Sequence, residues 1–250
     1  MKYLISILLA LTVSFSAATA ASAQETTASA QEKIRVLLTF GGHGFEQEPF
    51  FAMFDAMKDV EYTKAPMPAS ADLLKPDLKK KYDVIVMYDM VGDLSAEQHN
   101  AFVALLNEGI GLVSLHHNMG AHRNWDEFRK ITGGKFIFEP CEIDGKKYTK
   151  SGWSHGEDMK VTVADKEHPI TKGLKDFEIH DETYNKYYTA ADAKVLLTTD
   201  HPKNDPKLAW VQDYGKSRVF YFMLGHDAKA WANPNFAEIL GRGIRWTAGK

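Results

Sequence analysis

Apolar and polar residues alternate along the chain in two different patterns. In the first half, short continuous apolar runs are separated by segments in which large side chains recur at helical spacing. Such apolar runs are typical of strands that are buried on both faces of a parallel sheet. They lie at 34–40 (IRVLLTF), 83–89 (DVIVMYD) and 111–115 (GLVSL). Helices are predicted at 46–59, at 95–107 behind a Ser95/Gln98 capping box, and from a cap at Asn124 to Lys130.

The second half of the chain predicts strands at closer spacing. Strand patterns occur at 157–165 and 193–200, and residues 207–224 predict two strands joined at a tight turn. A closing helix begins at Asn233-Pro234, because proline suits the first helical position, and ends near Trp246. The two halves together predict an α/β fold with an open, mostly parallel sheet, flanking helices and an antiparallel extension.

The N-terminal residues predict export. Lys2 precedes an apolar run that ends in small residues at Ala21-Ser22-Ala23, which is the pattern of a cleaved signal peptide over 1–23. A polar linker follows at 24–33, and a single domain is expected over 34–249. Removal of the signal peptide leaves 250 − 23 = 227 residues and no further apolar run long enough to cross a membrane. We therefore expect a periplasmic or secreted protein.

Composition limits the partners of this domain. The chain is 44% hydrophobic and 25% charged, with a formal net charge of −3 and no basic cluster, which argues against nucleic acid as a partner. The single cysteine, Cys141, cannot form an internal disulfide. We interpret it as a small filler residue, because no activating group lies beside it in the sequence.

Histidines follow three of four predicted strands. His43 and Glu46 come after the first strand, Asp89 ends the second, and His116, His117 and Asn118 follow the third. Gly225, His226 and Asp227 follow the last strand of the 207–224 pair. One such histidine is usually a hydrogen-bonded loop residue. Because ligands of open α/β sheets bind beyond the carboxyl ends of the strands, three histidines at equivalent ends predict a shared site.

Two further segments carry candidate site residues. In IHDETYNKYY, Asp181 and Glu182 lie beside tyrosines, which fits either a carboxylate site with aromatic walls or an edge strand with half-buried tyrosines. The irregular segment 138–157 contains Trp153 and His155 and is a candidate lid.

Histidine at a strand end suits two kinds of chemistry. Its unperturbed pKa of ~6.5 allows proton transfer near neutral pH. Neutral imidazole is also a preferred ligand of zinc and similar divalent ions. The spacings do not match a compact H-x-x-x-H motif, so a metal site would be assembled from distant loops.

The ordered motifs resemble the ThuA-like (trehalose utilisation) family of the class I glutamine-amidotransferase-like superfamily. The resemblance rests on GGHGFEQEPF, YDVIVMYD, GIGLVSLHH, HPITKGL, DETYNKYY, LAWVQDYGKSRVFYFMLGHD and FAEILGRGIRWTAG. It implies a flavodoxin-like three-layer α/β/α sandwich. In the amidotransferase relatives a catalytic cysteine occupies the strand-to-helix elbow, where this chain has His116. His226 matches the relatives' late histidine, but Ala228 replaces their glutamate, so amide hydrolysis by a thiol is not expected.

The resemblance also implies carbohydrate chemistry, in particular on disaccharides processed through 3-keto intermediates. We expect an enzyme with a small carbohydrate substrate, either a sugar isomerase or a metal-dependent hydrolase or lyase. The alternative is a non-catalytic module that binds a sugar or glycan. The expected catalytic residues are His116, His226 and Glu182, and a divalent metal such as zinc would be held by His43, His116 and His226. The expected substrate-binding residues are His43, Glu46, Asp89, His117, Asn118, Trp153, His155, Asp181, Tyr184 and Asp227.

Overall fold

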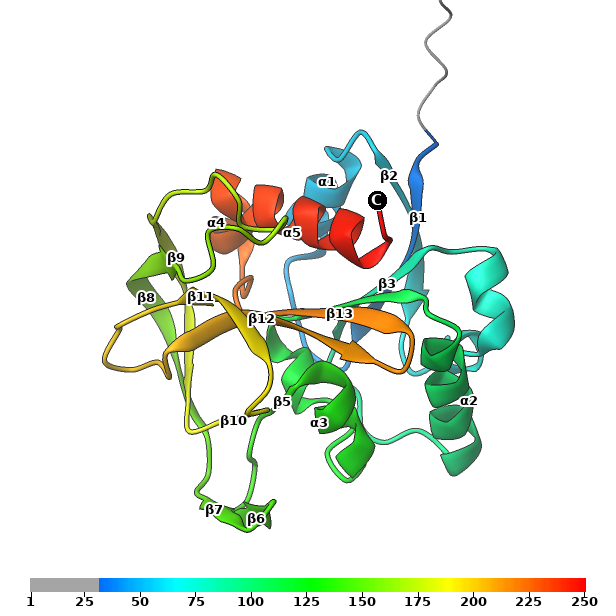
Figure 1. Cartoon of the computed structure of the whole chain (residues 1–250), viewed down its shortest axis with the longest axis horizontal. Coiled ribbons are helices and arrows are strands. Elements are labelled where there is room, and N and C mark those ends of the chain that lie inside the picture. Colours follow the sequence, from blue (N-terminus) through cyan, green and yellow to red (C-terminus); the bar gives the residue numbers. More distant parts are fainter. Residues whose placement is uncertain (1–31) are drawn as a thin grey trace, which may run out of the picture. The chain divides into compact units, whose positions relative to one another are not determined.

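A nine-stranded sheet runs through the computed structural model, which describes residues 32–250 (Figure 1). The predicted signal peptide and nearly all of the predicted linker lie outside the described residues. The strand order in the sheet is β2-β1-β3-β4-β13-β12-β11-β8-β9. These strands are β1 (Ile34–Gly41), β2 (Val60–Pro66), β3 (Val84–Asp89), β4 (Gly111–Leu115), β8 (Gly152–Val163), β9 (Phe177–Asn185), β11 (Lys194–Thr198), β12 (Lys207–Tyr214) and β13 (Ser217–Phe222).

The sheet has a parallel half and an antiparallel half. β2, β1, β3, β4 and β13 pair in parallel, and the pairs from β13 through β12, β11 and β8 to β9 are antiparallel. β3 and β4 lie inside the parallel half, and every residue in both is buried. Their continuous apolar runs arise because helices cover both faces of these strands. This arrangement confirms the predicted α/β sandwich with an antiparallel extension.

Helices on the two faces of the sheet complete three layers (Figure 1). They are α1 (Gln47–Asp55), α2 (Ala96–Asn107), α3 (Asp126–Thr132), α4 (Ala228–Trp231) and α5 (Pro234–Thr247). One apolar core joins the sheet to α1, α4 and α5, and a second joins it to α2 and α3. The predicted Ser95/Gln98 capping box begins α2, and the Asn233 side chain caps α5.

Smaller elements complete the described chain. The 3-10 turns are η1 (Ala71–Leu73), η2 (Pro76–Lys80) and η3 (His116–Gly120), and the short strands are β5 (Gly134–Lys135), β6 (Cys141–Ile143), β7 (Lys146–Tyr148) and β10 (Tyr188–Thr189). β6 and β7 form a hairpin that projects away from the large sheet (Figure 1). No helix in residues 32–250 combines the length and the apolar character needed to span a membrane.

Two local predictions are wrong. Asn124 does not cap α3, which begins at Asp126; instead its side-chain amide donates to Asp93 at 2.6 Å. Cys141 is not a filler in the core, because it is exposed on the β6–β7 hairpin. Asn124 binds a residue that is distant in the sequence, and Cys141 lies on a hairpin that was not predicted.

The candidate lid is a composite of ordered elements. Its middle is the β6–β7 hairpin, held to α3 by Arg129, whose guanidinium pairs with Asp144 at 3.0 and 3.1 Å. Its last residues are the first residues of β8, which pair with β9. Only the two ends of the segment, around Phe138 and from Trp153 to His155, reach the site described below.

Candidate functional site

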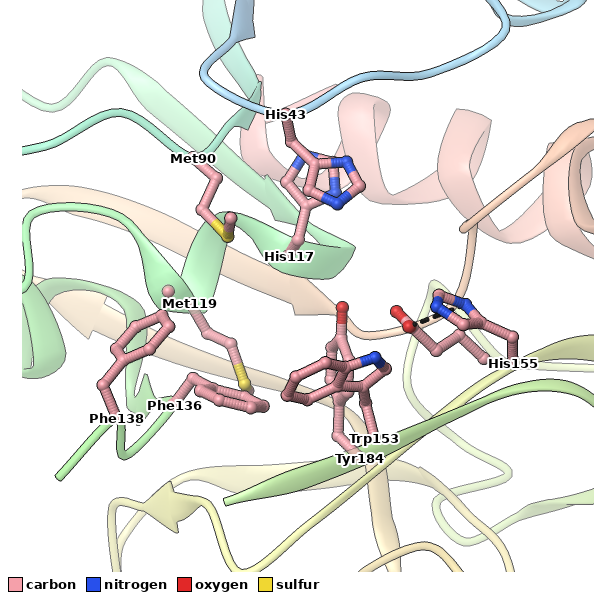
Figure 2. A pocket seen from close by; sticks show the side chains of 11 residues that line it. His43, Met90, His117, Met119, Phe136, Phe138, Trp153, His155 and Tyr184 are labelled. Atoms are coloured by element: carbon pink, nitrogen blue, oxygen red, sulfur yellow. Dashed lines mark ion pairs between the residues drawn. The ribbon is translucent and has the colours of Figure 1, made fainter. Parts of the chain in front are cut away.

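A cavity of about 280 Å³ lies at the carboxyl ends of the parallel strands (Figure 2). The loops after β1, β3 and β4 contribute to its wall, and the segment after β5 and residues of β8 and β9 complete it. Its lining residues are His43, Met90, His117, Met119, Gly120, Phe136, Phe138, Trp153, His155, Glu182 and Tyr184. A polar edge formed by distant strand ends is the place where such sheets bind ligands.

The turn after β4 aims His116 at the base of this site. His116 has a φ of 47°, a left-handed conformation that is uncommon for a residue with a side chain. The Tyr221 hydroxyl donates to the His116 carbonyl at 2.6 Å, and His116 Nδ1 lies 2.7 Å from the Met223 carbonyl oxygen. Because that carbonyl can only accept, Nδ1 must carry the hydrogen. The other ring nitrogen, Nε2, is therefore free to act as a base or a ligand.

Three ligand atoms meet at Nε2 of His116. Glu182 Oε2 lies 3.1 Å from His116 Nε2 and 3.4 Å from His226 Nδ1, and the two nitrogens are 3.2 Å apart. His116 is fully buried and Glu182 nearly so. Three electron-rich atoms at these distances repel one another unless a proton or a cation lies among them. The cluster can therefore hold either.

The charges of the cluster are coupled. Burial raises the pKa of Glu182, but hydrogen bonds from His226 and, when its Nε2 carries a proton, from His116 outweigh that effect and hold the pKa of Glu182 below its ordinary value. The hydrogen bond to Glu182 in turn raises the pKa of His226 against the opposing effect of burial. The Glu182 carboxylate and a proton on His226 therefore stabilise each other.

Asp181 positions the His226 loop. Its buried carboxylate accepts hydrogen bonds from the backbone N–H groups of Gly225 at 2.7 Å, His226 at 2.9 Å and Glu182 at 2.8 Å. Burial raises the pKa of Asp181 despite these bonds. The structure thus gives Asp181 a supporting role, because its oxygens accept from backbone N–H groups. Like His116 and His226, it does not line the cavity itself.

The loop after β1 places His43 over His117. Gly42 has a φ of 74°, and a Cβ there would lie 2.5 Å from the Met90 carbonyl oxygen, so the close approach of the two loops requires glycine. The His43 ring stacks on His117 with centroids 4.6 Å apart. Burial lowers the pKa of both histidines, that of His117 well below its ordinary value, so both are neutral near pH 7.

β8 and β9 supply the opposite wall. His155 Nδ1 lies 3.0 Å from Glu182 Oε1, and the Tyr184 hydroxyl lies 3.0 Å from His116 Nε2. Trp153 stands beside them with 54% of its surface exposed, which is unusual for tryptophan (Figure 2). The pairing of β8 and β9 shifts register between Ser154 and Glu157, so a bulge interrupts the ladder at His155.

Four other predicted substrate-binding residues face away from the cavity. The buried Asp89 carboxylate accepts from Thr39, and the Asn118 amide donates to the Asp89 carbonyl at 2.7 Å and accepts from Ser114 at 2.6 Å. Asp227 caps α4 by accepting from the backbone of Lys229 and Ala230, and Glu46 accepts from the Ala228 N–H at 3.0 Å. These polar groups hold strand ends and a helix start. None of Asp89, Asn118, Asp227 and Glu46 lines the cavity, and their predicted contacts with a substrate stay predictions.

Apolar residues of the wall were not among the predicted site residues. They are Met90, Met119, Gly120, Phe136 and Phe138. Isolated methionines and phenylalanines have the sequence pattern of a core. The signal that could have found two of them is position, because Met90 directly follows β3 and Met119 lies within η3 after β4.

The predicted metal-ligand set needs one correction. Among residues 32–250, the group of potential ligands whose atoms lie within 4.8 Å of one another is His116, Glu182 and His226. His43 is not in it, because its ring stacks on His117 and its centroid lies 6.2 Å from that of His226. Ligands about 2.1 Å from zinc at tetrahedral angles are roughly 3.4 Å apart. The separations of 3.1–3.4 Å in the cluster fit that arrangement.

Fold and site together define a three-layer α/β protein in which the turn after the parallel strand β4 carries His116. The chain belongs to the ThuA family, described as trehalose utilisation, which it matches over residues 16–247.

Solved structures share this fold at low sequence identity. A ThuA-like protein from Parabacteroides merdae is 23% identical with a TM-score of 0.71, covering 88% of this chain and 91% of that one. A ThuA-like protein from Bacteroides uniformis is 19% identical with a TM-score of 0.65, covering 92% and 95%. A glutamine amidotransferase from Thermotoga maritima is 10% identical with a TM-score of 0.50, covering 88% and 100%. No match was found among curated proteins.

Proposed function

We propose that the protein is an exported enzyme that acts on a small carbohydrate, with a divalent metal ion such as zinc held by His116, Glu182 and His226. The observation that carries the proposal is the spacing of the three ligand atoms, 3.1–3.4 Å. Of the three residues, Glu182 lines the cavity, and His116 and His226 lie behind it. Two histidines and one glutamate form a recurrent ligand set of catalytic zinc. The hydrogen bond from His116 Nδ1 to the Met223 carbonyl is the outer contact that orients a metal-binding imidazole.

The carbohydrate part of the proposal rests on the family and on the cavity wall. The family is described as trehalose utilisation. An exposed tryptophan beside polar groups, as Trp153 is beside Glu182 and His155, offers a flat apolar face to a sugar ring. Export rests on the signal-peptide pattern of residues 1–23.

The reaction that suits the neighbouring groups is proton transfer next to a carbonyl, as in the isomerisation of a keto-sugar. A bound divalent ion would supply Lewis acidity toward the carbonyl oxygen. His43 lines the same cavity and is neutral because burial lowers its pKa, so it can accept a proton from the adjacent carbon. The Tyr184 hydroxyl, close to the cluster, can donate a hydrogen bond to a sugar oxygen.

A second candidate is proton transfer without a metal. It is favoured by the position of the Tyr184 hydroxyl, 3.0 Å from His116 Nε2, where it can donate to the nitrogen lone pair that a metal would use. In that case His116 is the base, and the protonated His226 beside Glu182 is the acid. The two candidates use the same site but differ in the base, His43 in the first and His116 in the second, and in whether a metal ion lies among the three ligand atoms.

Metal analysis combined with hydrogen exchange tests the proposal. The protein is isolated from the periplasm or medium, with Gln24 as its expected first residue, and its metal content is measured. We expect about one divalent ion per wild-type chain and little in Glu182→Gln, which keeps the shape but loses the charge. The control is His180→Gln, because His180 lies on the same strand but pairs with Asp158 outside the cavity. Exchange of solvent deuterium into a 3-keto-glucoside is then followed by NMR.

The outcomes separate the alternatives. Full metal content in Glu182→Gln would remove the proposed centre. Deuterium exchange that continues after the metal is removed by a chelator, but is lost in His116→Gln, would establish the metal-free candidate. Saturable sugar binding without exchange under any metal condition would show that the domain is a sugar-binding module instead.

A further inference from the structure

The cavity has two chemically different halves. His43, His117, His155, Glu182 and Tyr184 supply the polar groups around the proposed centre. The remaining wall is formed by Met90, Met119, Gly120, Phe136 and Phe138, with Trp153 between the two halves (Figure 2). None of these five side chains carries a hydroxyl, amide or charged group.

The apolar half is a packed wall. A Cβ on Gly120 would lie 3.2 Å from Met90 Sδ and 3.3 Å from Phe138 Cζ, so these three residues are in close contact. Phe136 packs on Phe138 with ring centroids 5.0 Å apart and reaches Trp153 at 6.2 Å. Arg123 lies over the Phe138 ring, with its guanidinium carbon 3.7 Å from the centroid. The wall is therefore supported and complete before any ligand binds.

A second sugar ring fits this half poorly. Each hydroxyl placed against methionine and phenylalanine side chains loses its hydrogen bonds to water and gains no side-chain partner. An alkyl or aromatic group has no hydrogen bonds to water to lose, and it gains contacts with the methionine thioethers and the phenylalanine rings. Each methylene buried there strengthens binding by roughly fourfold.

We propose that the substrate is a glycoside of one sugar and an apolar group, in which the sugar faces the His116–Glu182–His226 cluster and the apolar group lies against Met90, Met119 and Phe136. This inference rests on the proposed function for the placement of the sugar. It replaces a disaccharide by an alkyl or aryl glycoside as the substrate class of the site.

A homologous series of ligands tests the inference. The probes are methyl, propyl, butyl and hexyl glucosides in both anomeric forms, with trehalose and hexanol as comparators, and the readout is calorimetry on the wild-type protein. We expect affinity to rise roughly fourfold per methylene until the wall is covered, and hexyl glucoside to bind at least tenfold more tightly than trehalose. In Met90→Gln we expect affinity to rise much less with the length of the alkyl chain. Met57→Gln is the control, because Met57 follows α1 in the sequence, is partly buried and does not line the cavity.

The comparators distinguish two kinds of failure. A flat alkyl series together with tighter binding of trehalose would overturn the apolar-group inference and leave the proposed carbohydrate function intact. Hexanol binding as tightly as hexyl glucoside would show that the sugar contributes nothing, which contradicts the proposed function. If affinity rises equally with chain length in Met90→Gln and Met57→Gln, the alkyl chain lies elsewhere.

Discussion

His116 shows how one backbone conformation can select the chemistry of a site. Its left-handed φ of 47° is costly for a residue with a side chain, and such conformations persist where the surrounding structure holds them. Two hydrogen bonds hold His116 in this conformation. The Tyr221 hydroxyl donates to the His116 carbonyl, and His116 Nδ1 donates to the Met223 carbonyl. The turn after β4 therefore presents a ring nitrogen, Nε2 of His116, toward Glu182 and His226.

Asp181 is the residue on which the position of His226 depends. Replacing it with asparagine removes one of two acceptor oxygens and directs an NH₂ group at backbone N–H donors. We expect Asp181→Asn to lower the free energy of unfolding by about 1–3 kcal/mol and to lower metal content as well. Denaturant unfolding and metal analysis are the measurements. Asp227→Asn is the matched control, because asparagine and aspartate are comparable helix caps; equal losses in the two variants would contradict this role.

At the scale of elements, the loop between β1 and α1 connects backbone conformation to the cavity. Gly42→Ala would introduce a Cβ at a φ of 74° and 2.5 Å from the Met90 carbonyl oxygen. We expect a loss of about 2 kcal/mol in the free energy of unfolding and a displaced His43. Gly44→Ala in the same loop has no heavy atom within 4 Å of its Cβ, so its effect should stay within about 0.5 kcal/mol. Urea titrations compare the two, and similar losses would refute the argument.

The order of elements could be predicted well from local pattern. β1, β3 and β4 were recognisable because a strand buried on both faces has a continuous apolar run. β2 was not predicted from the sequence. Its residues, VEYTKAP, lie at the sheet edge, and exposed polar residues separate the few that are buried. β9 is the opposite edge strand, as one interpretation of its sequence predicted, but the tyrosines of its segment, IHDETYNKYY, are buried and not half-buried, and it carries the buried Glu182.

At the scale of the whole molecule, Asp89 links stability to pH. Burial raises its pKa from 3.8 to about 6, although Thr39 donates to it. The folded state therefore binds this proton more tightly than the unfolded state, and the contribution of Asp89 to stability falls as pH rises from about 4 to 6. The full change corresponds to about 3 kcal/mol.

Asp89→Asn isolates this effect from the histidines. We expect the stability of the wild type relative to Asp89→Asn to decrease by up to about 3 kcal/mol between pH 4 and pH 6, and then to level off. Chemical denaturation of both proteins at pH 4, 5, 6 and 7 measures the difference. Parallel profiles across this range would mean that Asp89 does not bind its proton more tightly in the fold.

The sequence alone determined most of the order of strands and helices, β2 excepted, and the sheet edge at which His43, His116 and His226 lie. It did so because burial patterns and strand ends are local properties, and parallel strands bring their carboxyl ends to one edge. Only the tertiary structure decided which groups face the cavity. Asp181 and Asp227 turn to backbone N–H groups, Glu182 takes the place expected of His43, and core-like methionines form a wall. Side-chain direction depends on partners brought together by β8 and β9, and no local pattern encodes those partners.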